Sequence, residues 1–187
     1  MNTVDFHGTS SSIMKELTNC VSSISSDEID SLVSLIMKSP RIFCFGAGRS
    51  GIILKSFCMR LNHLGLNSYY LGTSQCPSAK EDDLLLLVSG SGETGCVLSY
   101  ATQARKLNLS IACITANRIN PLTKIADTVI NVDAPSSLVN TNSVSTQPMR
   151  SLFEQAAFII CETLLLMLQL NLGVSELDMA KRHANIL

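Results

Sequence analysis

Five short apolar runs, separated by longer segments with helical spacing, constrain the fold of this 187-residue chain more than any other feature. The runs lie at residues 42–45, 68–71, 84–88, 110–114 and 128–132. Between the first and second runs, and again between the third and fourth, apolar residues recur every three or four positions, as on one face of a helix. This alternation predicts βαβ units and therefore an α/β fold, with a five-stranded parallel sheet flanked by helices in a flavodoxin-like three-layer sandwich.

The segments outside the predicted sheet complete a single domain over residues 1–187. Helical spacing before the first strand predicts N-terminal helices over about 10–38. Residues 134–147 are polar and aperiodic, and they form either a lid or a plain surface loop. Pro148 is predicted to open a long helix that ends before Gly173. A further C-terminal helix is expected over about 175–187, because Ser175 and the acid three residues later form an N-cap pair.

Charge and cysteine content narrow the class of partner. Lysine and arginine number 14 against 15 acids, so no basic surface is predicted for nucleic acid and a small molecule is the expected partner. The seven cysteines show no metal-ligand spacing and are predicted to be free thiols in a reducing compartment, with no metal site. The chain starts without a signal segment, and the apolar stretch 156–170 is interrupted by Glu162 and Gln169. We therefore expect a cytoplasmic protein with no membrane span.

A glycine-rich turn follows the first predicted strand. Residues 46–51 read Gly-Ala-Gly-Arg-Ser-Gly, which matches the dinucleotide fingerprint of a strand-to-helix turn. A dinucleotide site also needs an acid at the end of the second strand, and the sequence there is Tyr-Tyr-Leu-Gly at 69–72, so nicotinamide binding is disfavoured. Arg49 could contact a ligand or be a solvated loop side chain. Ser50 could cap the following helix, donate to a phosphate, or do both.

A second turn, rich in serine and glycine, follows the third predicted strand. Its hydroxyls and glycine-exposed N–H groups lie at a helix N-terminus, which suits a phosphate; alternatively, Ser91 is an ordinary N-cap. Loops at the carboxyl ends of strands one and three can face one crevice in such a sheet. We therefore predict that both turns hold one phosphate through four hydroxyl side chains: Ser50, Ser89, Ser91 and Thr94. Further substrate contacts are expected from Gly48, Arg49, Gly90 and Gly92.

The Ser-x-Ser-x-x-Thr pattern of the second turn resembles the sugar-phosphate loop of the SIS (sugar isomerase) domain family. Within that family, the segments 46–51, 59–65, 147–155 and 182–185 are similar to the 6-phospho-3-hexuloisomerases. The resemblance implies an enzyme that interconverts a 3-hexulose 6-phosphate and fructose 6-phosphate through an enediol, in the ribulose monophosphate pathway. It further implies that neither a metal nor an organic cofactor is needed.

The resemblance also suggests two catalytic residues. Glu154 matches the proposed base of the family, and its apolar neighbours on the long helix are expected to raise its pKa by desolvation. Alternatively, residues 151–154 (Ser-Leu-Phe-Glu) form a capping box in which Glu154 only satisfies backbone N–H groups. His183 would reach the site of a neighbouring subunit, as histidines do in related isomerases, so the resemblance implies a homo-oligomer, most simply a tetramer. His63 ends the predicted first crossover helix and is expected to be either a packing residue or one that interacts with the dipole at the helix C-terminus.

One segment departs from the family pattern, and two other functions stay open. The loop after the second strand carries Thr73 and Cys76 where an acid and a threonine are expected, which could alter a contact to a sugar hydroxyl. Cys76 is either a reactive thiol or a packing thiol. The alternatives are a non-catalytic sugar-phosphate sensor and an isomerase of another phosphosugar, such as a pentose 5-phosphate. The serine-rich N-terminal helices lack the basic residues of a DNA-recognition helix.

Overall fold

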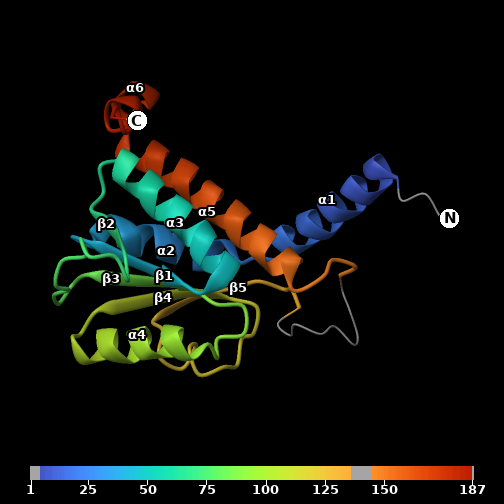
Figure 1. The fold of residues 1–187 in the computed structure, drawn as a ribbon, viewed down its shortest axis with the longest axis horizontal. Helices are drawn as coiled ribbons and strands as arrows, with labels where there is room; N and C mark the ends of the chain where they lie inside the picture. Colours follow the sequence, from blue (N-terminus) through green and yellow to red (C-terminus); the bar gives the residue numbers. More distant parts are fainter. Residues whose placement is uncertain (1–4, 136–144, 187) are drawn as a thin grey trace.

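The computed structural model describes residues 5–135 and 145–186 and contains one sheet with helices on both faces (Figure 1). The five strands are β1 (Ile42–Gly46), β2 (Ser68–Tyr70), β3 (Leu84–Val88), β4 (Ser110–Thr115) and β5 (Thr128–Asn131). The helices are α1 (Phe6–Ser22), α2 (Ser26–Lys38), α3 (Gly48–His63), α4 (Gly95–Lys106), α5 (Ser151–Leu172) and α6 (Glu176–Lys181). The predicted strands are therefore confirmed, each within one residue at either end.

All five strands are parallel, in the order β2-β1-β3-β4-β5. The register places Phe43 beside Tyr69 on one side and beside Leu85 on the other. The order of the strands reverses between β1 and β3, and in open α/β sheets the crevice at the carboxyl ends of such strands is where ligands bind. The predicted flavodoxin-like arrangement is confirmed, and it directs attention to the loops after β1 and β3.

The two faces of the sheet are covered by different helices. Successive side chains of a strand point to opposite faces, so Cys44 and Leu86 pack toward α2, α3 and α5, whereas Phe43 and Leu85 pack toward α4. In Figure 1, α3 and α5 lie side by side above the sheet and α4 lies below it. Because both faces are buried, the central strand β3 consists of four leucines and a valine, with no polar alternation.

The first and last helices each have one boundary that differs from the sequence prediction. α1 begins at Phe6, four residues earlier than expected, because the side chain of Asp5 accepts hydrogen bonds from the backbone N–H groups of His7 and Gly8. The C-terminal helix ends at Lys181 and is shorter than predicted. Its start is confirmed: Ser175 Oγ accepts from the N–H of Asp178, whose carboxylate in turn bonds back to Ser175, which completes a capping box.

The long helix α5 begins later than predicted. Pro148 was expected to open it, but the first helical residue is Ser151. Met149 and Arg150 have φ angles of 55° and 65°, so the chain between Pro148 and Ser151 is left-handed and cannot belong to a right-handed helix. The N-cap is Arg150, with no side-chain capping bond, so the capping-box interpretation of residues 151–154 is wrong. The C-terminal end is as predicted, with Gly173 in the left-handed conformation that such a cap requires.

The same helix bears on the expectation that the chain has no membrane span. At 22 residues, α5 is long and apolar enough to cross a membrane by length and composition alone. Half of its most apolar window is buried within the fold, as expected of a core helix. Residues 136–144, the middle of the polar stretch interpreted as a lid or surface loop, lie outside the described residues.

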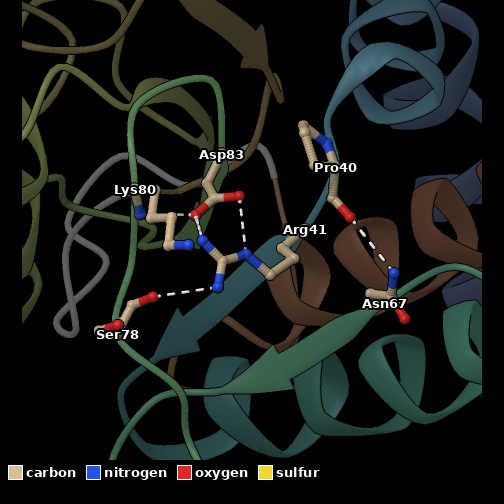
Figure 2. Close-up of polar contacts among 6 residues, drawn as sticks. All are labelled: Pro40, Arg41, Asn67, Ser78, Lys80 and Asp83. Carbon is tan, nitrogen blue, oxygen red and sulfur yellow. Dashed lines mark hydrogen bonds and ion pairs between the residues drawn. The ribbon is translucent and has the colours of Figure 1, made fainter.

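An arginine–carboxylate pair closes the amino end of the sheet (Figure 2). Arg41, just before β1, donates to both carboxylate oxygens of Asp83, just before β3, at 3.0 and 2.6 Å. Its remaining nitrogen donates to the carbonyl of Ser78, and the N–H of Lys80 donates to Asp83. Asp83 is 1% exposed, so its carboxylate is buried, and the Arg41 guanidinium and the N–H of Lys80 donate hydrogen bonds to it.

Candidate active site

A cavity of about 240 Å³ opens at the carboxyl ends of β1 and β3. Residues from both predicted turns line it, together with the start of α5. The lining residues are Ala47, Gly48, Arg49, Ser50, Val88, Ser89, Gly90, Thr94, Arg150, Phe153 and Glu154. The structure thus brings together eight of the predicted site residues: Gly48, Arg49, Ser50, Ser89, Gly90, Thr94 and Glu154 line the cavity, and Gly92 shapes the second turn.

Three helices point their N-termini at this cavity. α3 starts at Gly48, α4 follows its N-cap Thr94, and α5 follows its N-cap Arg150. In none of the three does the N-cap side chain satisfy a backbone N–H. The first N–H groups of a helix carry partial positive charge and need acceptors, so this end of the sheet is arranged to bind an anion.

The turn after β1 uses its glycines for close packing. A Cβ on Gly51 would collide with the carbonyl oxygen of Gly46 and with the hydroxyl of Tyr70. That hydroxyl donates a 2.7 Å hydrogen bond to the Gly46 carbonyl and so braces the turn from the neighbouring strand. Ser50 lies in the first turn of α3 after the N-cap Ala47, so it does not cap the helix, and it is one of the residues that line the cavity.

The turn after β3 is held by its own side chains. Ser89 is buried, and its Oγ accepts from the N–H of Gly92 at 3.2 Å and lies 3.4 Å from the hydroxyl oxygen of Thr94. Gly92 has a φ of 67° and no room for a Cβ. Ser91 does not line the cavity; its Oγ accepts from the N–H of Glu93. Because α4 starts after Thr94, the alternative that Ser91 is the N-cap is wrong.

Glu154 enters the cavity from the first turn of α5 and meets Arg49 from α3. Arg49 Nε lies 2.7 Å from Glu154 Oε2, which makes an ion pair, but the two groups are not aligned as a hydrogen bond. The Glu154 side chain is 13% exposed and that of Arg49 is 63% exposed. Oε2 is buried and receives no hydrogen bond from any residue that the structure describes. A carboxylate held in this way can take up a proton from a bound molecule.

His183 lies at the other end of the subunit. Its ring packs 5.3 Å from the ring of His63, at the C-terminal end of α3, whereas the cavity is lined by residues 48–50 at the N-terminal end of the same helix. Fifteen helical steps separate the two ends, a length of roughly 22 Å, so His183 does not reach Glu154 of its own subunit. His63 is buried, and burial, with help from Arg60 and His183, lowers its pKa. The interpretation of His63 as a packing residue is confirmed.

Several residues of the site were not predicted from the sequence. Arg150 and Phe153 line the cavity, although the motif around them was recognised. Asn120 is buried against Gly92. Its amide nitrogen donates to Thr115 Oγ1 at 3.3 Å, and its amide oxygen accepts from a backbone N–H. In the same loop, the N–H of Leu122 donates to the carbonyl of Gly92. The loop after β4 therefore supports the serine-rich turn. The Asn-Pro pair at 120–121 indicated a turn but not this contact.

Two further observations concern cysteines and metals. Cys76 is half-buried, and burial raises its pKa, which disfavours the thiolate and supports the packing-thiol interpretation. Within residues 5–135 and 145–186, no three or more histidine, cysteine or acidic side chains are grouped in a way that could hold a metal ion. The cavity donors are hydroxyls, N–H groups and arginine, which suit a phosphate.

Comparison with known proteins supports this arrangement. The SIS domain family matches residues 35–158, which is most of the chain and includes both turns and Glu154. This chain belongs to the SIS domain family. The resemblance inferred from the Ser89 turn is therefore confirmed, and with it the fold.

Three known proteins illustrate what the chain is similar to. The chain is 38% identical to the 3-hexulose-6-phosphate isomerase of Bacillus subtilis (strain 168), over 93% of this chain and 95% of that protein. A crystal structure of a Methanococcus jannaschii protein, described as inferring a molecular function of 3-hexulose-6-phosphate isomerase, matches with a TM-score of 0.82 at 33% identity, over 96% of this chain and 99% of that one. Vibrio vulnificus NanR complexed with ManNAc-6P matches at 0.74 and 18% identity, over 96% and 67%, which shows the fold alone.

Proposed function

We propose that the chain is a 3-hexulose-6-phosphate isomerase, which interconverts 3-hexulose 6-phosphate and fructose 6-phosphate. One observation carries the proposal: Glu154 lies in the same cavity as the two turns that offer phosphate donors. A phosphate held by the turns would place the sugar chain beside this carboxylate. The names of the relatives at 38% identity support the same substrate class.

The phosphate site would be formed by hydroxyls and helix N-termini. Ser50, Ser89 and Thr94 line the cavity, with the backbone of Gly48 and Gly90 beside them. Hydrogen bonds to a charged group are worth roughly 1.5–3 kcal/mol each, so a few of them hold a dianion without a lysine. Ser91 would contribute only if its side chain turned away from Glu93.

Glu154 would act as the base that moves one proton. Its carboxylate takes the hydrogen from the carbon next to the ketone, and the electron pair left behind forms the carbon–carbon double bond of an enediolate. The protonated carboxyl then returns this proton to the carbon that carried the ketone. The hydroxyl proton on the neighbouring oxygen moves to the enediolate oxygen, so the former hydroxyl becomes the carbonyl, the former ketone becomes a hydroxyl, and the reaction is balanced without a co-reactant. Arg49 and the helix N-termini would stabilise the negative charge on the enediolate oxygen.

His183 would complete the site of a neighbouring subunit in a homo-oligomer, and we propose a tetramer. Support comes from an apolar surface on α5 and α3, where Ile52, Phe158, Leu166 and Leu170 are exposed. Mixing subunits tests this. Glu154→Gln and His183→Ala proteins, each inactive alone, should regain part of the activity when they are co-assembled, because some sites then combine an intact glutamate with an intact histidine. No recovery in proven hybrids would place His183 outside the site.

The remaining elements of the proposal concern where the enzyme works. All seven cysteines are free thiols, which suits a reducing cytoplasm. There the reaction would serve formaldehyde fixation or detoxification through the ribulose monophosphate pathway. Thr73 and Cys76 would influence which sugar is preferred.

A coupled assay tests the proposed function. The purified protein is added to a hexulose-phosphate synthase with ribulose 5-phosphate and formaldehyde, and fructose 6-phosphate is followed with time. We expect product with the wild-type protein and none with Glu154→Gln. Binding of substrate without turnover would identify a sensor, and turnover only of pentose 5-phosphates would identify a different isomerase.

A further inference from the structure

A half-buried glutamate outside the cavity, Glu16, connects the first helix to the segment that precedes α5. Glu16 on α1 accepts four hydrogen bonds, and all four donors lie within residues 145–147. Ser145 Oγ donates at 2.7 Å, the N–H and hydroxyl of Thr146 at 2.9 and 2.8 Å, and the Gln147 side-chain amide at 3.0 Å. Burial alone would raise the pKa of Glu16, but the hydrogen bonds lower it to about 2.

The segment that Glu16 holds leads directly into a strained turn. After Gln147 come Pro148 and then Met149 and Arg150, both left-handed, before α5 begins at Ser151. Residues without a glycine's freedom keep this conformation only where their surroundings impose it. One end of the turn is the packed helix α5. The other end is the Glu16 anchor, where Ser145 and Gln147 are buried.

The left-handed turn leads directly into the residues of α5 that line the cavity. Arg150 is the N-cap of α5 and lines the cavity, and Phe153 and Glu154 follow in the first turn of the helix. The N–H of Glu154 donates to the carbonyl of Arg150, so the glutamate is attached to the turn through the backbone. Glu16 itself does not line the cavity. The hydrogen bonds of Glu16 therefore connect it to the site through residues 145–150, beside the direct packing of α1 on α5.

We propose that Glu16 is a positioning residue of the isomerase site: by holding residues 145–147 on α1, it fixes the Met149–Arg150 turn and thereby places Glu154 against the bound sugar. The inference rests on the proposed function. The turns after β1 and β3 have their own supports in Tyr70 and Asn120, so loss of the Glu16 anchor should disturb proton transfer more than phosphate binding.

The test compares Glu16 with a matched glutamate on the neighbouring helix. Glu28 on α2 also accepts hydrogen bonds from distant residues, the N–H of Asn131 at 3.0 Å and Arg118 Nη1 at 3.3 Å, but it supports β5 and not α5. The variants are Glu16→Ala, Glu16→Gln, Glu16→Asp and Glu28→Ala. For each, we would measure kcat, the Kd for inorganic phosphate, the Tm, and hydrogen exchange in the first turn of α5.

We expect Glu16→Ala to lower kcat by about 30-fold, since small misplacements of catalytic groups cost up to about a hundredfold. Its Kd for phosphate should stay within about threefold, and exchange at residues 151–154 should become faster. Glu16→Gln keeps one acceptor oxygen and should fall between Glu16→Ala and wild type. Glu28→Ala should keep its kcat and its α5 exchange, even if its Tm falls.

Two kinetic results would overturn the proposal. One is an unchanged kcat in Glu16→Ala. The other is a loss of kcat in step with phosphate affinity and matched by Glu28→Ala, which would show a general structural role. If Glu16→Ala does not fold, the same comparison is made with Glu16→Gln and Glu16→Asp. A wild-type protein without turnover would refute the proposed function, while unchanged exchange at 151–154 in the Glu16 variants would refute the anchor itself.

Discussion

Strand β1 has an arginine–carboxylate pair at each end, and the two pairs differ in how completely they are satisfied. At the amino end, Arg41 donates two aligned hydrogen bonds to Asp83 (Figure 2). The N–H of Lys80 also donates to Asp83, and the carbonyl of Ser78 accepts from Arg41. At the carboxyl end, Arg49 approaches Glu154 at 2.7 Å without hydrogen-bond alignment. The same two chemical groups are therefore fully hydrogen-bonded at the amino end of β1, which we call the closed pair. At the carboxyl end they form an ion pair without an aligned hydrogen bond, which we call the open pair.

The difference follows from what surrounds each carboxylate. Asp83 accepts hydrogen bonds from the backbone N–H of Lys80 and from the guanidinium of Arg41, whose side chain is also mostly buried. Glu154 shares a cavity with three helix N-termini that lack side-chain caps, and the side chain of its partner Arg49 is largely exposed. A carboxylate whose hydrogen bonds are complete is poorly suited to accept a proton. One with a buried oxygen that lacks a hydrogen bond is well suited to it.

The largest effect should come from Glu154→Gln. Removal of a general base costs roughly 10²–10⁴ in rate, so we expect kcat to fall at least about a thousandfold. The amide keeps the size of the side chain, so the thermal stabilisation caused by inorganic phosphate should persist. Steady-state kinetics and a thermal-shift titration measure the two quantities. A Glu154→Gln enzyme with full activity would remove Glu154 from the mechanism.

Asp83→Asn should have the opposite effect: it should lower the stability of the protein and leave kcat unchanged. Breaking a buried ion pair from one side leaves the other charge without its partner, and we expect a loss of about 3 kcal/mol in the free energy of unfolding. The kcat of the folded variant should match wild type, because Asp83 lies at the far end of β1 from the cavity. Urea unfolding measures the first quantity and the coupled assay the second. A drop in kcat without a drop in stability would contradict the division of roles.

The contrast between the two ends also explains what the sequence could predict. Strands such as β3 were located because a strand buried on both faces reads as an unbroken apolar run. The meeting of the two turns followed from the parallel order of the strands. The left-handed pair Met149–Arg150 could not be predicted, since neither residue is a glycine and the conformation depends on contacts that are distant in sequence.

Other features of the site depend on long-range packing in the same way. The Arg49–Glu154 pair joins α3 to α5, and the bond from Tyr70 to Gly46 joins two strands. Local patterns carry no signal for either contact. Ser91 fits the family motif by spacing, yet its orientation toward Glu93 is decided by the local turn. Spacing therefore identified the anion-binding loops, whereas the orientation of individual side chains required the structure.

Thr94→Ala gives a smaller and more selective effect at the carboxyl end. An N-cap threonine normally stabilises its helix, but the Thr94 side chain makes no capping bond, so the Tm should hardly change. Loss of one hydrogen bond to a phosphate should raise KM about tenfold, in line with the strength of charge-assisted bonds. Steady-state kinetics measures KM, and differential scanning calorimetry measures the Tm. A lowered Tm with an unchanged KM would mean that Thr94 serves the helix and not the ligand.

The mildest test exchanges each arginine for lysine, which keeps the charge but loses the two-pronged geometry. Arg41 uses that geometry on both oxygens of Asp83, so Arg41→Lys should lower the Tm and leave kcat/KM unchanged. Arg49, whose side chain is largely exposed, makes a single contact with Glu154, so Arg49→Lys should leave the Tm unchanged and lower kcat/KM by about fivefold, the scale of an ion pair near the surface. If both variants lost stability and neither lost activity, the two ends of β1 would be equivalent, and the open pair at Glu154 would have no part in catalysis.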